Sequence, residues 1–392
     1  MAFVGSSKDF DKKYAVKNAV GLTPSAGELY GGATYPTLGA NDLIRLDEAD
    51  IIDNPEQFDD VSSTGNMIKR GTEVSAVLPT FSLKSKFYSL GIEPILIAAM
   101  GYEDLDGPLN YSTTEYSHLF DIDPEGKDQR AYDTTEAADA TANVALSPAY
   151  NAGDRLNRYF TLGIEKGPYD EQLHNCAISE FTISAESKGP VMLEASGTGE
   201  IVVRNTSKTT VDSWTELSGA FDQWFALRHC SATFGPLASE IAVSIFSYSI
   251  KTTYGMAEDL VTSGTSNSGL SRAEPVSTGE IECEVTFQIN KHDTINYKTY
   301  EQAGTVCSLT LDHTRGTDRL ILLFPHLVIQ SATEEISDGS KINVVAKGYL
   351  PTGVDPYTTE RSLSGTEHTK AKTTPFYFIL SNQRSDNGLR LQ

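Results

Sequence analysis

The 392-residue sequence lacks the short motifs that mark the common enzyme classes. It contains no GxSxG nucleophile elbow, HExxH zinc motif, GxxxxGK phosphate loop or GxGxxG dinucleotide fingerprint. Gly197 and Gly199 lie between strand-like residues with no helix after them, so they do not predict a nucleotide site. We therefore predict no enzymatic activity and no cofactor.

Cysteine is scarce, and none of the four cysteines stands in a CxxC spacing. This excludes a zinc ribbon and a disulfide framework and favours a reducing cytoplasm. His174 lies near Cys176, and His229 is next to Cys230. A closed zinc site needs four ligands, commonly in paired close spacing. We therefore predict no metal site at either pair.

Long apolar runs and an excess of basic charge are also missing. No segment approaches the ~20 consecutive apolar residues of a transmembrane helix, and the amino terminus lacks both a basic start and an apolar run. We predict neither a signal peptide nor membrane insertion. The formal net charge of -22 disfavours tight binding to nucleic acid and to anionic membranes.

Two stretches about two hundred residues apart share one pattern. In the first, Gly71–Phe81 predicts a long strand and Ile92–Met100 predicts a short buried helix that stops at Gly101. In the second, Gly279–Phe287 predicts a strand and Asp293–Tyr300 predicts a short helix that stops by Gly304. Each pattern ends in a pair of predicted strands: 176–185 with 191–203, and 320–330 with 341–350. The sequence predicts a mainly β fold with short helices.

The duplication predicts two tandem modules with additional segments around them. Residues 104–159 are rich in Asp, Thr, Ala and Asn and have no counterpart in the second half, so they are interpreted as a surface insertion. Trp214 and Trp224 are predicted to seal the modules together. The apolar run 375–380 needs a surface, in its own protomer or the next. The predicted organisation is an arm (1–35), a first module (36–210), a junction (211–236), a second module (237–350) and an extension (351–392).

One predicted strand carries three alternating carboxylates, Glu280, Glu282 and Glu284, opposite Ile281, Cys283 and Val285. Alternation places the glutamates on one face of a strand. In an ordinary sheet this is a solvated outer face. In a ring-forming barrel the same face would line a channel. The matching segment of the first half carries only Glu73, which would make an acidic lining uneven.

In the order and spacing of these landmarks, the chain resembles the tail tube proteins of long-tailed bacteriophages, in the branch whose subunits carry two tube modules. The resemblance covers most of residues 36–350. Its landmarks are the strand and helix of 71–101, the segment 169–184, Ser249–Lys251 before a long loop, the strand and helix from Gly279, and 320–325 before a closing hairpin.

The resemblance implies that each module adds a curved antiparallel sheet with a flanking helix to a ring-closed inner β-barrel. Three subunits would form a pseudo-sixfold ring, and stacked rings would form a negatively charged conduit for genome ejection. The implied partners are other copies of the chain, a tape-measure protein in the lumen, tail terminator and distal tail proteins, and double-stranded DNA in transit. The implied location is the virion tail, after assembly in the host cytoplasm.

The resemblance also implies that the loops 53–70 and 256–278 and both termini reach the adjacent ring. Glu73, Glu280, Glu282 and Glu284 are the candidate lumen-facing residues. The candidate contacts between rings are Asp59, Asp60, Met256, Asp259, Phe376 and Phe378.

Two other functions stay open at the level of the sequence. A two-module β-sandwich that binds carbohydrate or a host surface would use the Tyr-, Thr- and Asn-rich loops. A tube of a contractile or secretion system would need a sheath partner.

Overall fold

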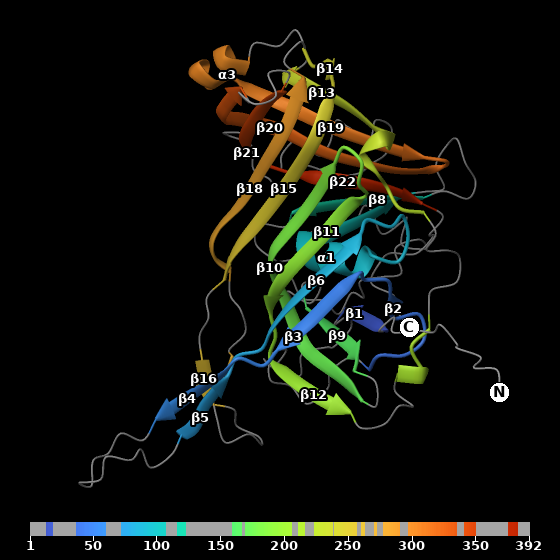
Figure 1. Ribbon diagram of the computed structural model, residues 1–392, viewed down its shortest axis with the longest axis vertical. Coiled ribbons are helices and arrows are strands. Elements are labelled where there is room, and N and C mark those ends of the chain that lie inside the picture. The colour runs from blue at the N-terminus through green and yellow to red at the C-terminus, as the bar shows by residue number, and fades with distance from the viewer. Residues whose placement is uncertain are drawn as a thin grey trace, which may run out of the picture.

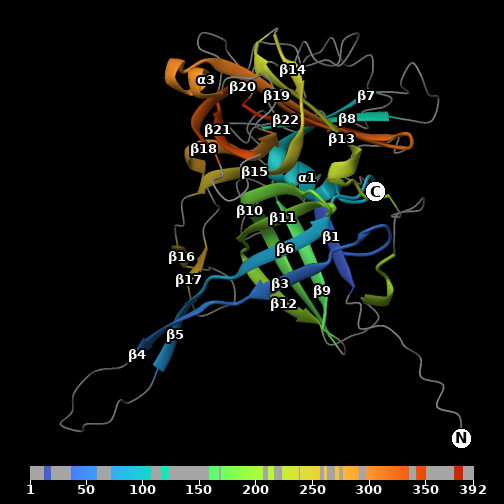
Figure 2. The ribbon, with the colours of Figure 1, turned by 45° about the horizontal axis from the view of Figure 1, so that its top comes forward.

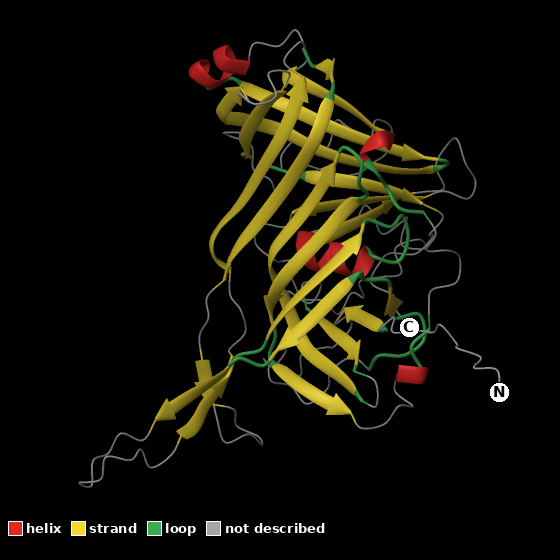
Figure 3. Cartoon of the chain, viewed as in Figure 1, coloured by secondary structure: helices red, strands yellow, loops and turns green. Residues whose placement is uncertain are grey.

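A computed structural model describes residues 13–18, 37–59, 72–106, 116–122, 159–166, 169–205, 211–215, 223–237, 239–256, 260–262, 270–272, 277–290, 297–334, 341–349 and 375–382. These residues are mainly β, with few helices (Figure 3), as the sequence predicts. Among the described residues, no helix combines the length and apolarity needed to span a membrane.

A row of antiparallel strands forms the backbone of the fold. Each neighbouring pair in it is antiparallel, and several of its strands run side by side across Figure 1. Its eight strands, in spatial order, are β3 (Glu48–Ile52), β6 (Thr80–Lys86), β11 (Val191–Thr198), β10 (Asp170–Glu186), β15 (Ile245–Met256), β18 (Ser277–Asn290), β21 (Lys341–Gly348) and β20 (Asp318–Glu334).

The long strands β10 and β20 connect this row to a second layer. The first part of β10 pairs with β9 (Phe160–Glu165) and β12 (Ile201–Asn205), and β9 continues to β1 (Tyr14–Asn18) and β2 (Leu43–Ile44). The first part of β20 pairs with β19 (Val306–Arg315), which continues to β13 (Cys230–Pro236) and β14 (Ile241–Val243). All described strands except four therefore belong to one large antiparallel sheet.

Bulges let β10 and β20 pass from one layer to the other. In β10 the register shifts between Leu173 and Cys176 on one side and between Ile178 and Glu180 on the other. In β20 a shift lies between Ile329 and Ser331. Because a bulge bends its strand and increases the local twist, each long strand can serve both layers.

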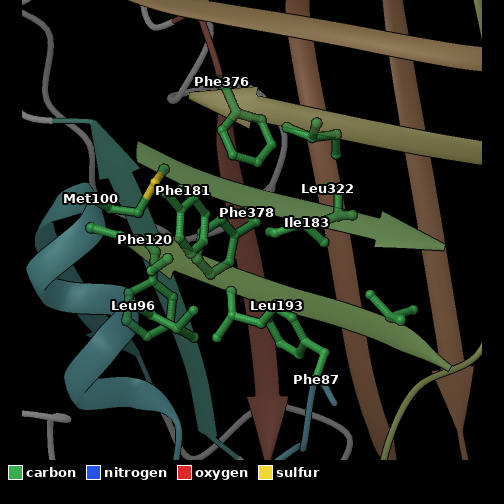
Figure 4. Packing of buried hydrophobic residues seen from close by; sticks show 14 of the residues in the cluster. Phe87, Leu96, Met100, Phe120, Phe181, Ile183, Leu193, Leu322, Phe376 and Phe378 are labelled. Carbon is green, nitrogen blue, oxygen red and sulfur yellow. The ribbon is translucent and has the colours of Figure 1, made fainter. Parts of the chain in front are cut away.

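The space between the layers holds a continuous apolar core. Helix α1 (Glu93–Met100) is buried along its whole length, which confirms the predicted short buried helix. Leu96 and Met100 of α1 gather with Phe120, Phe181 and Phe378 from three strands (Figure 4). The second predicted helix is α3 (Tyr297–Ala303), which contacts β20 and is followed by Gly304 in the left-handed region (φ 60°).

Parts of the predicted surface insertion and of the predicted extension pair with each other. Part of the predicted surface insertion forms β7 (Gly101–Asp106) and β8 (Tyr116–Ile122), and the extension supplies β22 (Tyr377–Asn382). Strand β22 lies between β8 and β20, with Phe378 opposite Phe120 and Leu322. This corrects the surface interpretation for 116–122, where Phe120 is fully buried, and shows that the apolar run docks within its own chain.

Buried polar contacts hold β22 against the start of α1. The Asn382 amide donates to the Ser89 carbonyl (2.7 Å) and to the Glu93 carboxylate (3.2 Å). Its carbonyl oxygen lies 3.1 Å from Nε2 of His118 on β8. The Glu93 carboxylate also accepts from the Gly91 amide. Because buried polar groups are costly unless they are hydrogen-bonded, this network fixes where β22 ends.

The predicted strand 71–81 is instead two strands in two sheets. Strand β5 (Thr72–Val77) ends before Pro79, and β6 begins at Thr80. Proline lacks the amide hydrogen that a ladder needs, so a break at Pro79 is expected. Strand β5 pairs with β4 (Pro55–Asp59) and with β17 (Leu270–Arg272), which pairs with β16 (Leu260–Thr262). These four strands form a separate small sheet that projects from the main sheet (Figures 1 and 2).

The amino-terminal arm and the junction also contribute to the sheet. Strand β1 lies inside the predicted arm, yet it pairs with β9 and β2 of its own chain and buries Val16. Trp214 packs with Ala15 and Leu38, both from the first half. The Trp224 carbonyl accepts from Arg315 (2.5 Å), and its backbone bridges to Tyr88. Of the two tryptophans, only Trp224 is shown in contact with both halves of the described chain.

Removing the Phe378 side chain should destabilise the chain strongly. Its ring is fully buried and stacks on Phe120 with centroids 4.9 Å apart. Phe378→Ala should lower the free energy of unfolding by about 3–5 kcal/mol, measured by urea titration. The matched control is Tyr349→Ala, an aromatic side chain that is 45% exposed. An equal loss in both variants would contradict the assignment of β22 to the core.

Acid should destabilise the chain partly through His313. Nδ1 of His313 donates to the Ala226 carbonyl (3.2 Å), so Nε2 accepts from the Tyr248 hydroxyl (2.9 Å). Burial lowers the pKa of His313 from its ordinary value of 6.5 to about 4. The folded state therefore binds the proton less tightly than the unfolded state, and stability present above pH 6.5 is lost as the pH falls towards 4.

Between pH 7 and pH 4, the free energy of unfolding should fall in both proteins. The fall should be roughly 3 kcal/mol smaller in His313→Gln than in the unmodified chain. Denaturant titrations across this pH range measure the difference. The matched control is His326→Gln, which removes the imidazole of a less buried histidine. Identical slopes for all three proteins would contradict the role given to His313.

Candidate functional site

The most extensive polar feature of the described chain is one face of the eight-stranded row. Along β6, Phe81, Leu83 and Ser85 are buried, whereas Ser82 and Lys84 are exposed. Strands β3, β11, β10, β15, β18 and β21 alternate similarly in their parts within the row, with largely apolar side chains towards the core. Because side chains alternate along a strand, the row presents one continuous polar surface, which we call the polar face.

Charges of opposite sign follow each other across the polar face. Strand pairing places one residue from each of the seven strands from β3 to β21 in a single lateral line. In order from β3 to β21, that line is Glu48, Lys84, Glu194, Thr182, Lys251, Glu284 and Lys347. Opposite charges on directly facing residues of neighbouring strands stabilise a sheet modestly, so the line is a ladder of compensated charge.

Ion pairs connect the lysines of this ladder to their neighbours. Lys84 donates a hydrogen bond to the Glu194 carboxylate, and this hydrogen bond raises the pKa of Lys84. Nζ of Lys251 lies 2.8 Å from the Glu180 carboxylate, and Nζ of Lys347 lies 3.6 Å from that of Glu282. The polar face therefore carries mixed charge rather than uninterrupted acid.

A hollow of about 270 Å³ lies on the β3 side of the polar face. It is lined by side chains of β3, β6, β11 and β10, including Glu48, Lys84, Glu180 and Glu194. The hollow therefore lies over four neighbouring strands of the row and is lined largely by polar side chains.

The candidate lumen residues lie in two different places. Glu282 and Glu284 are on β18 and belong to the polar face, where Glu282 has 63% of its side chain exposed. Glu280 is also on β18, but its side chain lies outside the described residues. Glu73 is on β5, in the small sheet rather than in the row. The described polar face thus contains two of the four candidates.

The candidate contacts between rings also separate. Asp59 ends β4 in the small sheet and Met256 ends β15, whereas Asp60 and Asp259 lie outside the described residues. Phe376 and Phe378 are fully buried within the chain. Their side chains are therefore not available for contact with another copy, which corrects the prediction for these two residues.

The row ends in two open edges. Among the described strands, β3 pairs only with β6, and the part of β20 from Ile329 onward pairs only with β21. An odd number of antiparallel steps separates the two edge strands, so they run in opposite directions. An open edge presents backbone groups that can pair with another strand.

Charged side chains flank the open edge of β3. Nζ of Lys166 lies 3.5 Å from Asp50, and the Arg204 guanidinium lies 2.5 Å from Asp53. Both cations also contact Glu171 at the start of β10. Charges at an edge limit indiscriminate pairing, so the edge is protected although no described strand covers it.

The two histidine–cysteine pairs have separate partners. Nδ1 of His174 lies 3.1 Å from the Thr161 hydroxyl, while the Cys176 thiol donates to the Leu173 carbonyl at 3.2 Å. Burial raises the pKa of Cys176 well above its ordinary value, which disfavours the thiolate that binds metals. Within the described residues, no three His, Cys, Asp or Glu side chains are grouped as a metal site would require.

No family model and no curated protein matches the chain. The geometry of the polar face and of the two open edges is therefore the basis for any functional proposal.

The lysines of the polar face should contribute little to stability. Lys84, Lys251 and Lys347 have 33–47% of their side chains exposed, and exposed ion pairs are worth at most about 1 kcal/mol. Replacing each by Gln should change the free energy of unfolding by less than about 1 kcal/mol in urea titrations. A loss of several kcal/mol would show that the ladder is a folding element rather than a surface available for function.

Proposed function

We propose that the chain is the structural subunit of a phage tail tube, which stacks as rings to form a conduit for the genome. The observation that carries the proposal is the eight-stranded row, with a polar face on one side and two open edges that run in opposite directions. If copies are related by rotation about a ring axis, β3 of the next copy keeps its direction relative to that axis. It therefore runs antiparallel to β20 of the first copy. Each copy can therefore extend the sheet of its neighbour until the ring closes and removes the edges.

Equivalent connectivity in the two halves supports two tandem tube modules. In the first half, β3 pairs with β6, β6 with β11, β11 with β10, and β10 with β9. In the second, β15 pairs with β18, β18 with β21, β21 with β20, and β20 with β19. Each module would give four strands to an inner barrel, and three copies would give a ring of pseudo-sixfold symmetry.

The polar face would line the bore, with the core and the second layer outside it. Its charge would be mixed, with the ladder lysines between the glutamates. DNA adheres through phosphate contacts from Lys and Arg. Because carboxylates flank each ladder lysine, these cations are already partly compensated. The wall would allow DNA and a tape-measure protein to pass without tight binding.

The small sheet supports contacts between stacked rings. It combines β5 with β4 from the predicted loop 53–70 and with β16 and β17 from the predicted loop 256–278, and it projects from the main sheet (Figure 2). Such a projection could reach a neighbouring ring, where copies of Asp59 and Met256 would lie near the contact. A tube of a contractile or secretion system would share this architecture, and the presence of a sheath gene beside the coding sequence would distinguish it.

The carbohydrate-binding alternative has no specific support in the described residues. It depends on Tyr-, Thr- and Asn-rich loops in 104–159, most of which lie outside the described part of the chain.

The proposal predicts rings and tubes. Purified protein, concentrated or mixed with other tail components, should form rings and stacked tubes in electron micrographs. A preparation that stays monomeric under both conditions, with no tube by imaging, would contradict the proposal.

Reversing the charge of β18 should affect transport rather than assembly. Replacing Glu280, Glu282 and Glu284 together by Lys should leave tubes intact but slow genome passage, because added cations would bind phosphates. Tube yield is measured by electron microscopy and ejection by DNA release over time. Replacing the same residues by Gln is the matched control, since it removes charge without adding cations. Normal ejection in the Lys variant would contradict the proposal that the charge of this face controls genome passage.

A further inference from the structure

The chain contains an internal example of the contact that a ring would need between copies. Strand β10 ends one group of four strands and β15 begins the next. Their pairing places Thr182 opposite Lys251 and Glu180 opposite Thr253. The corresponding strands at the two ends of the row are β20 and β3.

The registers show which residues of the two halves are equivalent. One lateral line of the first half matches one line of the second, and in both a bulge follows the last residue. The first line is Ile51, Phe81, Gly197 and Ile178. The second line is Ile250, Val285, Ala346 and Ile329.

The match continues into the second layer. On β10 and β9, Leu173 faces Leu162; on β20 and β19, Phe324 faces Leu309. Three residues further along β10, past a register shift, Cys176 faces Phe160 of β9. Three residues further along β20, past a corresponding shift, Leu327 faces Cys307 of β19. Each residue of β20 therefore has a defined counterpart on β10, and each residue of β3 has one on β15.

This equivalence transfers the β10–β15 register to the open edges. Counting from the matched lines, Thr333 corresponds to Thr182, and Ile52 corresponds to Lys251. Two residues earlier on β20, Ser331 corresponds to Glu180, whereas the counterpart of Thr253 is Asn54, which lies beyond the end of β3 and has a positive φ of 44°. All four edge positions are at least partly exposed.

We propose that β20 of one copy pairs with β3 of a second copy in this register, with Thr333 opposite Ile52. The proposal rests on the proposed tube function, because it specifies the contact that closes the ring. Ile52 is 50% exposed in the single chain. A β-branched partner such as Thr333 directly across the strands would cover it, and such pairs are favourable in sheets.

Paired cysteines test the register. Directly opposed residues on antiparallel strands are close enough for a disulfide, whereas a shift of two residues separates them too far. Ile52→Cys with Thr333→Cys should form disulfide-linked dimers and trimers on oxidation of the assembled protein, seen by non-reducing electrophoresis. The shifted pair, Ile52→Cys with Ser331→Cys, should give several-fold less linkage.

Two controls calibrate the measurement. Thr182→Cys with Lys251→Cys places the same geometry inside one chain and should form an intrachain disulfide. The single variants show any linkage through the native cysteines, three of which are buried.

The outcomes separate this proposal from the proposed function. Strong linkage of the matched pair supports the register. If rings and tubes form but the shifted pair links more strongly, the register is overturned while the tube function stands. If the intrachain control links but no double variant assembles or links between copies, both the register and the tube function are overturned.

Discussion

The fold depends on the ladder between β10 and β15. It is the contact that turns two groups of four strands into one row, because it pairs seven consecutive residues, 180–186, with residues 247–253. Without this ladder, each group would end in another open edge, and unpaired backbone groups at an edge favour association with whatever strand is available. The same ladder keeps the polar side chains of both groups on one face.

The bends in β10 and β20 explain how a single sheet forms both the eight-stranded row and the second layer. Each strand begins in the second layer and ends in the row, with bulges between the two parts. The core therefore fills the space between layers that are covalently continuous. Helix α1 and the inserted strand β22 complete this core, and the stacked rings of Phe120 and Phe378 join segments that are far apart in the sequence.

Much of the fold was predictable from local pattern. The alternation from Ile281 to Ile289 predicted β18, and the apolar run at Ile92–Met100, with Pro94 near its first turn, predicted α1. Strand β19 was missed, although Cys307, Leu309 and Leu311 alternate with polar residues. The position of β22 could not be predicted, because an apolar run identifies a buried strand but not the strands on either side of it.

The candidate site was only partly predictable for the same reason. The alternating glutamates placed Glu282 and Glu284 on a polar face, but their lysine neighbours come from strands distant in sequence. Lys251 and Lys347 become neighbours of Glu284 only through strand pairing. The sequence groups Glu73 with the glutamates of β18, because local pattern does not show that the chain changes sheets at Pro79.

The central claim is that the backbone edges of β3 and β20 become paired when copies assemble. Hydrogen–deuterium exchange of the dispersed subunit and of its assembled form tests this claim most directly. The account predicts that edge-facing amides in 48–52 and 331–334 exchange far more slowly after assembly, while amides already paired within the row, such as those of β11, change little. Equal exchange at both edges before and after assembly would contradict it.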